Sequence, residues 1–311
     1  MKSDRVIRAG LAATLCLLAA CADDSAPAGA APGTTPGTTS AGKPASAGAV
    51  VIDGRETTWH DAARTQKQSE GERRGGREEG EWTYWYPDGR IARQGTFVAG
   101  RPEGLWTEYH PNGAKKSERH FKAAKGDGPA LLWHDNGQMM TRTTYVDGVV
   151  DGEITEWHPN GVKLREGRYA AGKKVGLSTS WHPNGEKATE GEFENDLQTG
   201  TWHSWWPNGK LVMEGAYVEG KQHGVWKRWY QDGTPSAEVG FDHGVQDGAA
   251  QAWYPDGKLE SRGRFVAGKR DGEWSYWKPD GTFDSERSGV YKDDVKVGDV
   301  PPVDPVLDDE R

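Results

Sequence analysis

GEWTYWYPDGRIARQGTFVAGRPE, residues 80–103, is one unit of a pattern that fills most of this chain. Every copy has an aromatic residue five places after its first glycine and a turn glycine nine places after it. A fixed period in this range is typical of repeat proteins, in which each unit buries its apolar face against its neighbours. The first glycine recurs every 24 residues without insertion, as Gly80, Gly104, Gly128, Gly152, Gly176, Gly200, Gly224, Gly248 and Gly272.

Each unit contains two predicted strands and two predicted turns. Residues 81–86 are rich in aromatic residues and threonine, which favours a strand, and Pro87-Asp88-Gly89 then interrupts it. A second strand is predicted over residues 90–98, and Ala99-Gly100-Arg101 turns the chain toward the next copy. We therefore expect an all-β fold: an elongated array of antiparallel β-hairpins, with about nine full repeats and a half-repeat at each end.

Two positions of the unit are aromatic in every copy, and we expect them to form the core. Because side chains alternate between the faces of a strand, Trp85 shares a face with Glu81 and Thr83. The first column is Trp85, Tyr109, Trp133, Trp157, Trp181, Trp205, Trp229, Trp253 and Trp277. The second is Phe97, Phe121, Tyr145, Tyr169, Phe193, Tyr217, Phe241 and Phe265.

Two other columns, those of Trp82 and Tyr86, vary between copies and are the candidate binding surface. Variation within a fixed framework is where specificity can reside, and the alternative is a partly exposed face under weak constraint. The candidate residues are Trp82, Tyr86, Trp106, His110, Trp202, Trp206, Trp226, Tyr230 and Trp274. The Tyr86 column also contains four histidines, but equivalent positions are about 9.5 Å apart, since strands are spaced about 4.8 Å. Metal ligands lie about 2 Å from the ion, so neighbouring histidines of this column cannot share one, and no metal site is predicted.

The N-terminal segment resembles a lipoprotein signal peptide. Lys2, Arg5 and Arg8 precede a short apolar run that ends in Leu18-Ala19-Ala20-Cys21, which resembles a bacterial lipobox. That resemblance implies cleavage after residue 20 and acylation, including palmitate, of Cys21, whereas an ordinary signal peptide with an incidental cysteine is the alternative. Ala22 favours the outer membrane over the inner, so we expect a lipid-anchored protein of the cell envelope that faces the periplasm or the surface.

The boundaries between the other segments of the chain follow from their amino-acid composition. Residues 21–50 hold the lipidated cysteine and a tether of small and polar residues, for which disorder is predicted. Residues 51–69 are a cap or linker, residues 70–298 the repeat domain, and residues 299–311 a disordered tail. The formal net charge is −8 and becomes more negative once the basic signal peptide is removed, which disfavours binding to nucleic acid.

The repeat resembles the bacterial variant of the MORN repeat, found in proteins sometimes described as antitoxin-type repeat proteins. The similarity lies in the Gly-x-Trp start, as in Gly200-Thr201-Trp202, and in the Tyr-Pro-Asp-Gly turn, as in residues 254–257. It continues in the Glu-Gly-x-aromatic second strand, as in residues 190–193, and covers about residues 70–298. The resemblance implies an elongated β array that binds proteins or membranes and is not an enzyme.

Three functions were compared on these grounds. The expected one is a non-catalytic, membrane-anchored scaffold that binds a protein partner in the bacterial envelope. The alternative is a cell-wall or polysaccharide-binding module, because glycans stack on exposed tryptophan and tyrosine rings. An enzyme is disfavoured, because the chain has no nucleophile elbow, His-Glu-x-x-His motif or phosphate loop, and no cofactor is predicted.

Overall fold

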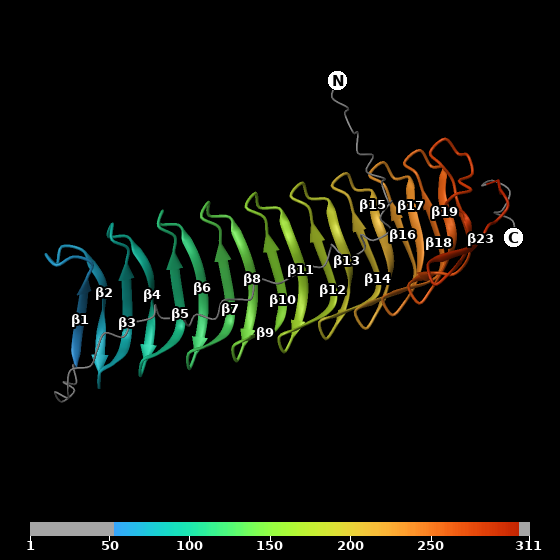
Figure 1. Ribbon diagram of the computed structural model, residues 1–311. Coiled ribbons are helices and arrows are strands. Elements are labelled where there is room, and N and C mark those ends of the chain that lie inside the picture. The colour runs from blue at the N-terminus through green and yellow to red at the C-terminus, as the bar shows by residue number, and fades with distance from the viewer. Residues whose placement is uncertain (1–52, 305–311) are drawn as a thin grey trace, which may run out of the picture. The chain divides into compact units, whose positions relative to one another are not determined.

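The structure is a computed structural model that describes residues 53–304. The predicted signal peptide, Cys21, the tether and the last seven residues of the tail lie outside the described residues. Within the described range every regular element is a strand, so none of it forms a helix that could cross a membrane. The strands form one open antiparallel sheet, which confirms the all-β repeat array and answers whether the array is open or closed (Figure 1).

The strand bounds follow the repeat closely. They are β1 (Gly54–Trp59), β2 (Lys67–Arg74), β3 (Arg77–Trp85), β4 (Ile91–Val98), β5 (Arg101–Tyr109), β6 (Lys115–Lys122), β7 (Lys125–Trp133), β8 (Met139–Val146), β9 (Val149–Val150), β10 (Gly152–Trp157), β11 (Lys163–Ala170), β12 (Lys173–Trp181), β13 (Lys187–Glu194), β14 (Leu197–Trp205), β15 (Leu211–Val218), β16 (Lys221–Trp229), β17 (Pro235–Asp242), β18 (Val245–Trp253), β19 (Leu259–Val266), β20 (Lys269–Arg270), β21 (Gly272–Tyr276), β22 (Gly289–Lys292) and β23 (Val295–Gly298).

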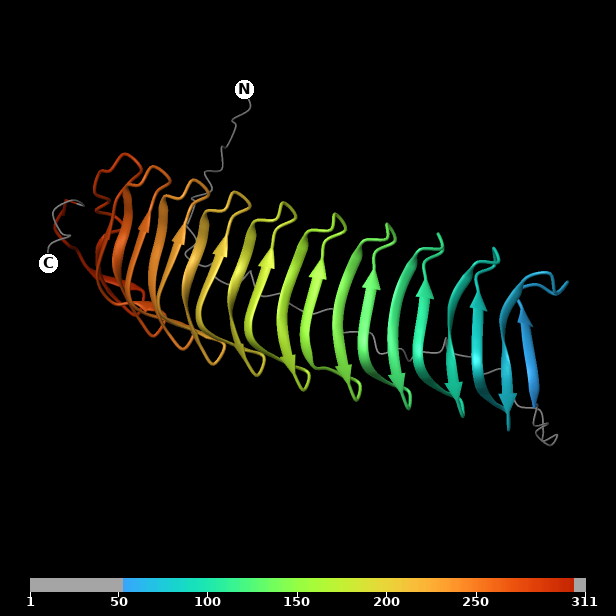
Figure 2. The same cartoon turned by 180° about the vertical axis from the view of Figure 1, so that it is seen from behind.

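Each strand pairs with the next one along the chain, so the sheet is a meander (Figure 2). β9 and β10 both pair with β8, and β20 and β21 both pair with β19, because a strand is interrupted there. The contacts of one repeat are therefore confined to its immediate neighbours, as in other repeat arrays.

The predicted turns are present. Gly89 has φ +85°, its amide donates to the carbonyl of Tyr86 at 2.9 Å, and the Asp88 carboxylate accepts from the amide of Arg90 at 3.0 Å. The strand before this turn begins earlier than predicted, at Arg77, and passes through Gly80 with φ +71°. In seven repeats the first glycine is thus a bulge inside a strand, whereas Gly152 and Gly272 begin β10 and β21.

The Phe97 column packs in the core as predicted, with Phe193, Phe241 and Phe265 5–9% exposed, but the prediction was wrong for the Trp85 column. Trp82, Trp106, Trp226 and Trp274 are only 1–7% exposed, whereas Trp202 is half-buried. The Trp85 column, expected in the core, is half-buried throughout except at Trp277. We call the two sides of the sheet the Trp82 face and the Trp85 face, after these columns.

A glycine on the preceding strand allows each buried indole to lie flat on the sheet. An added Cβ at Gly71, Gly95, Gly191, Gly215 or Gly263 would lie 2.2 or 2.3 Å from the ring of a tryptophan eleven residues later. Each of these indoles also donates its Nε1–H to a backbone carbonyl, as Trp202 does to Glu192 at 3.2 Å. The Phe97 column lies on the same face, and its rings meet the indoles edge-on, as Phe97 meets Trp106 at 4.8 Å.

The variation of the Trp82 column is compensated across the strand pair, which explains why a buried column varies. Where tryptophan is replaced by a smaller residue, the opposing glycine is generally replaced by a larger one. The compensated pairs are Arg119 with Ala130, Thr143 with Ile154, and Val239 with Ala250. The exception is Gly167 with Ser178, in which both residues are small. Constancy between repeats is therefore a poor guide to burial in this array.

Modified repeats form both ends of the array. At the N-terminus, residues 54–60 form the first half of a further repeat, although a cap or linker was predicted there. The 24-residue pattern does not reveal this half-repeat, because a longer turn shifts it two residues toward the N-terminus. At the C-terminus, the Trp277 ring is 1% exposed and meets Phe283 edge-on. Its Nε1–H donates to the carbonyl of Val303, so the predicted disordered tail contributes a contact in its described part.

The contact between indole and glycine predicts a contrast between two equivalent substitutions. Gly191→Ala places a methyl group into the Trp202 ring and should destabilise the protein by about 1–3 kcal/mol, the usual cost of overpacking. In Gly167→Ala the methyl group comes no closer than 3.4 Å to any atom, at the hydroxyl of Ser178, so this variant should be neutral or stabilising, because alanine is preferred to glycine within a strand. Urea unfolding of both variants measures the difference, and equal destabilisation would contradict the packing described here.

Candidate functional site

The Tyr86 column, predicted as a binding surface, connects consecutive repeats. Seven of its nine side chains bond to a backbone carbonyl 23 residues later, in the next repeat. The Tyr86 hydroxyl donates to the carbonyl of Tyr109 at 2.7 Å, and the Tyr230 hydroxyl donates to that of Trp253 at 2.7 Å. The histidine Nε2 atoms of His110, His134, His158 and His182 make the equivalent bond at 2.7–3.0 Å. A structural role therefore accounts for the four histidines.

The turn asparagines connect the same repeats a second time. The Oδ1 of Asn160 accepts from the amide of Val162 within its own turn, and its Nδ2 donates to the carbonyl of Pro183 at 2.8 Å. Asn112, Asn136, Asn184 and Asn208 repeat this pattern. The Nε1 of Trp206, by contrast, is buried without a hydrogen-bond partner among the described residues. Of the nine predicted binding residues, the tryptophans at 82, 106, 202, 226 and 274 pack on the sheet, and Tyr86, His110 and Tyr230 link repeats.

The Trp85 face instead presents a row of aromatic rings, one in each repeat. Its rings recur in each repeat, and the eight from Trp85 to Trp253 remain half-buried. In three repeats the residue after the first glycine adds an exposed apolar side chain to the same face, since Leu105, Leu177 and Val225 are 47%, 57% and 58% exposed. The half-exposed rings and these exposed apolar side chains make this face the better candidate for a binding surface. The structure reverses the two roles that the sequence analysis assigned.

Lysine and glutamate accompany the rings of this face in several repeats. Lys163 lies over the Trp181 ring, 5.2 Å from its centre, and its Nζ bonds to Glu166 at 2.7 Å. Lys187 likewise lies over the Trp205 ring, 5.6 Å from its centre, and its Nζ bonds to Glu190 at 2.6 Å. Hydrogen bonds from Arg55 and Lys67 lower the pKa of Glu70 to about 2, and a bond from Lys187 lowers the pKa of Glu190. At neutral pH these carboxylates are ionised and paired, so the surface is amphipathic and locally neutralised.

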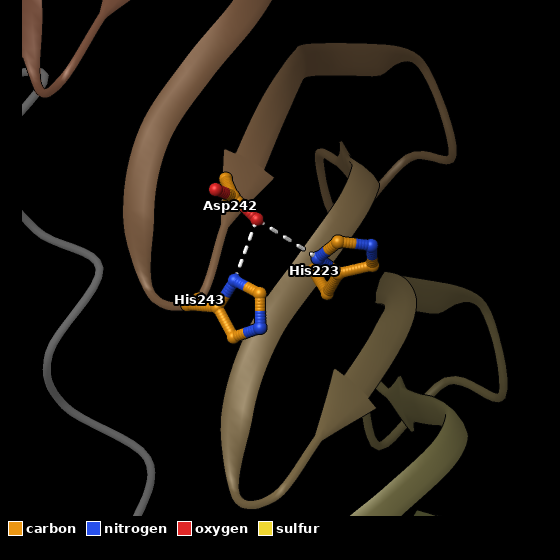
Figure 3. A group of neighbouring side chains, drawn as sticks. All are labelled: His223, Asp242 and His243. Atoms are coloured by element: carbon orange, nitrogen blue, oxygen red, sulfur yellow. Dashed lines mark hydrogen bonds and ion pairs between the residues drawn. The ribbon is translucent and has the colours of Figure 1, made fainter.

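The structure also brings together three residues that sequence analysis did not select. His223 lies on β16, Asp242 is the last residue of β17, and His243 begins the turn that follows (Figure 3). The Oδ1 of Asp242 is 3.3 Å from the Nδ1 of His223 and 2.6 Å from the Nδ1 of His243. All three side chains are exposed, and one ligand atom from each lies within 4.8 Å of the others.

The repeat itself contains the signal that identifies this cluster. An acid twenty residues before the turn accepts from the turn amide in other copies, as Asp247 accepts from the amide of Ala267 at 3.1 Å. His223 replaces that acid in the seventh repeat, and the turn residue facing it is His243. Two imidazoles and a carboxylate are suitable ligands for a transition metal such as zinc.

We expect the three side chains to bind one Zn²⁺ ion, because two imidazole nitrogens and a carboxylate oxygen lie within 4.8 Å of one another. Titration with Zn²⁺, followed through the imidazole NMR signals of His223 and His243, should show saturable 1:1 broadening or shifts. His223→Ala should abolish the effect, whereas His158→Ala, which removes a histidine outside the cluster, should preserve it. An unchanged titration of His223→Ala would exclude this site.

The repeat is the part of this chain that is similar to a known family. The model of the MORN repeat variant matches six segments, residues 78–99, 102–123, 174–195, 198–219, 222–243 and 246–267. Comparison with curated proteins found no significant match. Among solved structures, a TcdB2-TccC3-Cdc42 complex is 11% identical, and a Photorhabdus luminescens Tc holotoxin pore with a TccC3 mutation is 13% identical.

This chain spans only a small part of the length of those structures. The aligned region covers 74% of this chain in both cases but only 14% and 13% of the others, and both TM-scores are 0.19. The six matched segments begin at multiples of the 24-residue period and coincide with hairpins of the sheet, two before and four after the unmatched residues 124–173. MORN repeats are generally modules that bind proteins or membranes. Six hairpins of the open sheet therefore match the MORN repeat variant.

Proposed function

We propose that this chain is a non-catalytic, membrane-anchored scaffold that binds a protein partner in the bacterial cell envelope. The observation that carries the proposal is the aromatic column of the Trp85 face. Core packing explains the Trp82 column, whose rings are buried and whose substitutions are compensated. It does not explain a large ring that occurs in all nine copies and remains half-exposed in eight of them.

The character of this face suits a protein partner with an extended surface. Rings, threonines and paired charges repeat along successive strands, and exposed apolar residues such as Leu177 and Val225 lie beside them. Tryptophan and tyrosine are enriched where proteins meet, because they bury a large area at a low cost in conformational entropy. A partner that follows the sheet can contact several repeats at once, so modest contacts add up.

Site-specific photocrosslinking in the envelope tests which face binds. A photoreactive amino acid in place of Leu177 should give a discrete adduct with a protein. The same residue in place of Arg93, which is exposed on the opposite face, should give none. Trp181→Ala should remove the Leu177 adduct, because its ring lies four residues along the same strand, while the array remains folded by circular dichroism. Adducts from Arg93 alone, or from neither position, would contradict the proposal.

Glycan binding is the alternative, and the half-exposed rings at regular spacing favour it, since sugars stack on aromatic faces. Sedimentation with purified peptidoglycan sacculi separates the two functions. Binding to bare sacculi that Trp181→Ala abolishes would replace the protein partner by a glycan. Binding that requires added membrane proteins supports the scaffold.

The membrane anchor depends on Cys21, which the structure does not describe. Cells expressing the protein and fed a palmitate analogue should label it, and the protein should sediment with outer membranes. Cys21→Ser should lose the label and appear in the soluble fraction, because the acyl chains supply the membrane affinity at about 0.8 kcal/mol for each buried CH₂. A labelled Cys21→Ser variant would show that the anchor lies elsewhere.

A further inference from the structure

The indole nitrogens of the Trp85 face are hydrogen-bond donors that lack acceptors in all but one repeat. The five indoles of the Trp82 face donate to backbone carbonyls at 3.0–3.2 Å. On the Trp85 face, within residues 53–304, only Trp277 donates, to the carbonyl of Val303 at 3.2 Å. In the same range Trp206 has the only buried indole nitrogen without a partner, so the free donors of the Trp85 face reach solvent. These donors belong to Trp85, Trp133, Trp157, Trp181, Trp205, Trp229 and Trp253.

The last ring of the column shows how such a donor is used. Trp277 is 1% exposed, and the segment that accepts its hydrogen bond, residues 299–304, is neither helix nor strand. Pro301 and Pro302 lie in this segment and fix φ near −65°, which favours the extended polyproline II conformation. A proline-containing segment of the chain itself therefore bonds to one ring of this column through a backbone carbonyl.

The spacing of the rings matches the turn of a polyproline II helix. Equivalent rings of consecutive repeats are about 9.5 Å apart, because two strands separate them. A polyproline II helix has three residues per turn, rises about 9.3 Å per turn, and leaves its carbonyls without internal hydrogen bonds. Every third residue therefore meets the next ring and presents a free acceptor. An α-helix returns to the same side every 5.4 Å with its carbonyls already bonded, and a strand alternates sides.

Two neighbouring rings, those of Trp229 and Trp253, are open to such a segment. Basic side chains lie over the rings of Trp85, Trp133, Trp157, Trp181 and Trp205. In the part of the chain that the structure describes, no cation and no second ring lies over Trp229 or Trp253. Their cross-strand partners, Pro235 and Leu259, carry no charge, and Val225 on the same face is 58% exposed. This part of the Trp85 face is therefore apolar and has two free donors.

We propose that Trp229 and Trp253 bind a proline-rich segment of the protein partner in the polyproline II conformation. That partner is the one of the function proposed above, on which this inference rests. Prolines three residues apart stack on the two rings, and each indole donates to a carbonyl of the segment, as Trp277 does to that of Val303. Aromatic surfaces bind proline-rich segments in this conformation, because the preformed helix loses little conformational entropy.

The test uses the full chain labelled with ¹⁵N-tryptophan, and N-acetyl-nonaproline-amide as the probe. Nonaproline has no amide proton along its backbone, so it accepts hydrogen bonds from the indoles. The indole signals of Trp229 and Trp253 should move downfield in a saturable manner. The signal of Trp226, which lies on the opposite face and bonds to the carbonyl of Ala216, should stay in place. Triproline should bind about tenfold more weakly, because it reaches only one ring, and a helical (Glu-Ala-Ala-Ala-Lys)₂ peptide should cause no shift.

Two matched substitutions locate the site. Trp253→Phe keeps an aromatic ring and removes the donor, so nonaproline should bind about fivefold more weakly, as on the loss of one hydrogen bond. Trp181→Phe removes the donor of a ring that Lys163 already covers, and it should leave binding unchanged. Equal weakening by the two variants, equal affinity for triproline and nonaproline, or no saturable shift would overturn the proposal. It would also be overturned if deletion of residues 305–311 moved these two signals and nonaproline did not, because the chain's own tail would then be the occupant.

The outcomes separate this site from the function on which it rests. A protein adduct at Leu177 without a response to nonaproline would overturn the proline-binding site and leave the scaffold in place. The absence of an adduct at Leu177 would overturn the scaffold, whatever the peptides do.

Discussion

The fold depends on a close contact between a tryptophan ring and a glycine on the neighbouring strand. A single-layer sheet has no second layer to cover its apolar face, so its large side chains must pack on the sheet itself. Glycine removes the Cβ that would stand in the way, and the indole then lies flat on backbone, 2.2 or 2.3 Å from where that Cβ would be. Edge-on rings of the Phe97 column flank it, and each such pair contributes about 0.5–1.5 kcal/mol beyond its buried area.

Hydrogen bonds along one edge of the sheet hold the repeats in register. A tyrosine or histidine of one repeat bonds to the backbone of the next, and the asparagine of the turn does so again two residues away. Aspartate cannot donate this second bond, and in two such repeats a basic residue does so instead. Arg90 reaches the carbonyl of Pro111 at 2.7 Å, and Lys258 reaches that of Pro279 at 3.1 Å. The period can therefore remain at 24 residues while individual side chains change.

Much of the architecture could be predicted from the sequence, because period, turns and strands are local properties. Which column of side chains is buried was harder to predict. Trp85 was expected in the core because it is aromatic in every copy, and Trp82 on the surface because it varies. Burial, however, depends on the residue across the strand pair, and the variation at Trp82 is matched by variation at its glycine partner. The His223, Asp242 and His243 cluster was missed for a similar reason, since it joins three different columns of the repeat.

The central claim is that the Trp82 column is the core and the Trp85 column is the accessible surface. Fluorine NMR of the protein labelled with 5-fluorotryptophan, recorded in H₂O and in D₂O, tests this directly, with resonances assigned by single substitution. The account predicts negligible solvent isotope shifts for Trp82, Trp106, Trp226 and Trp274, and clear shifts for Trp85, Trp157, Trp181 and Trp229. Large shifts in the first group with negligible shifts in the second would contradict it.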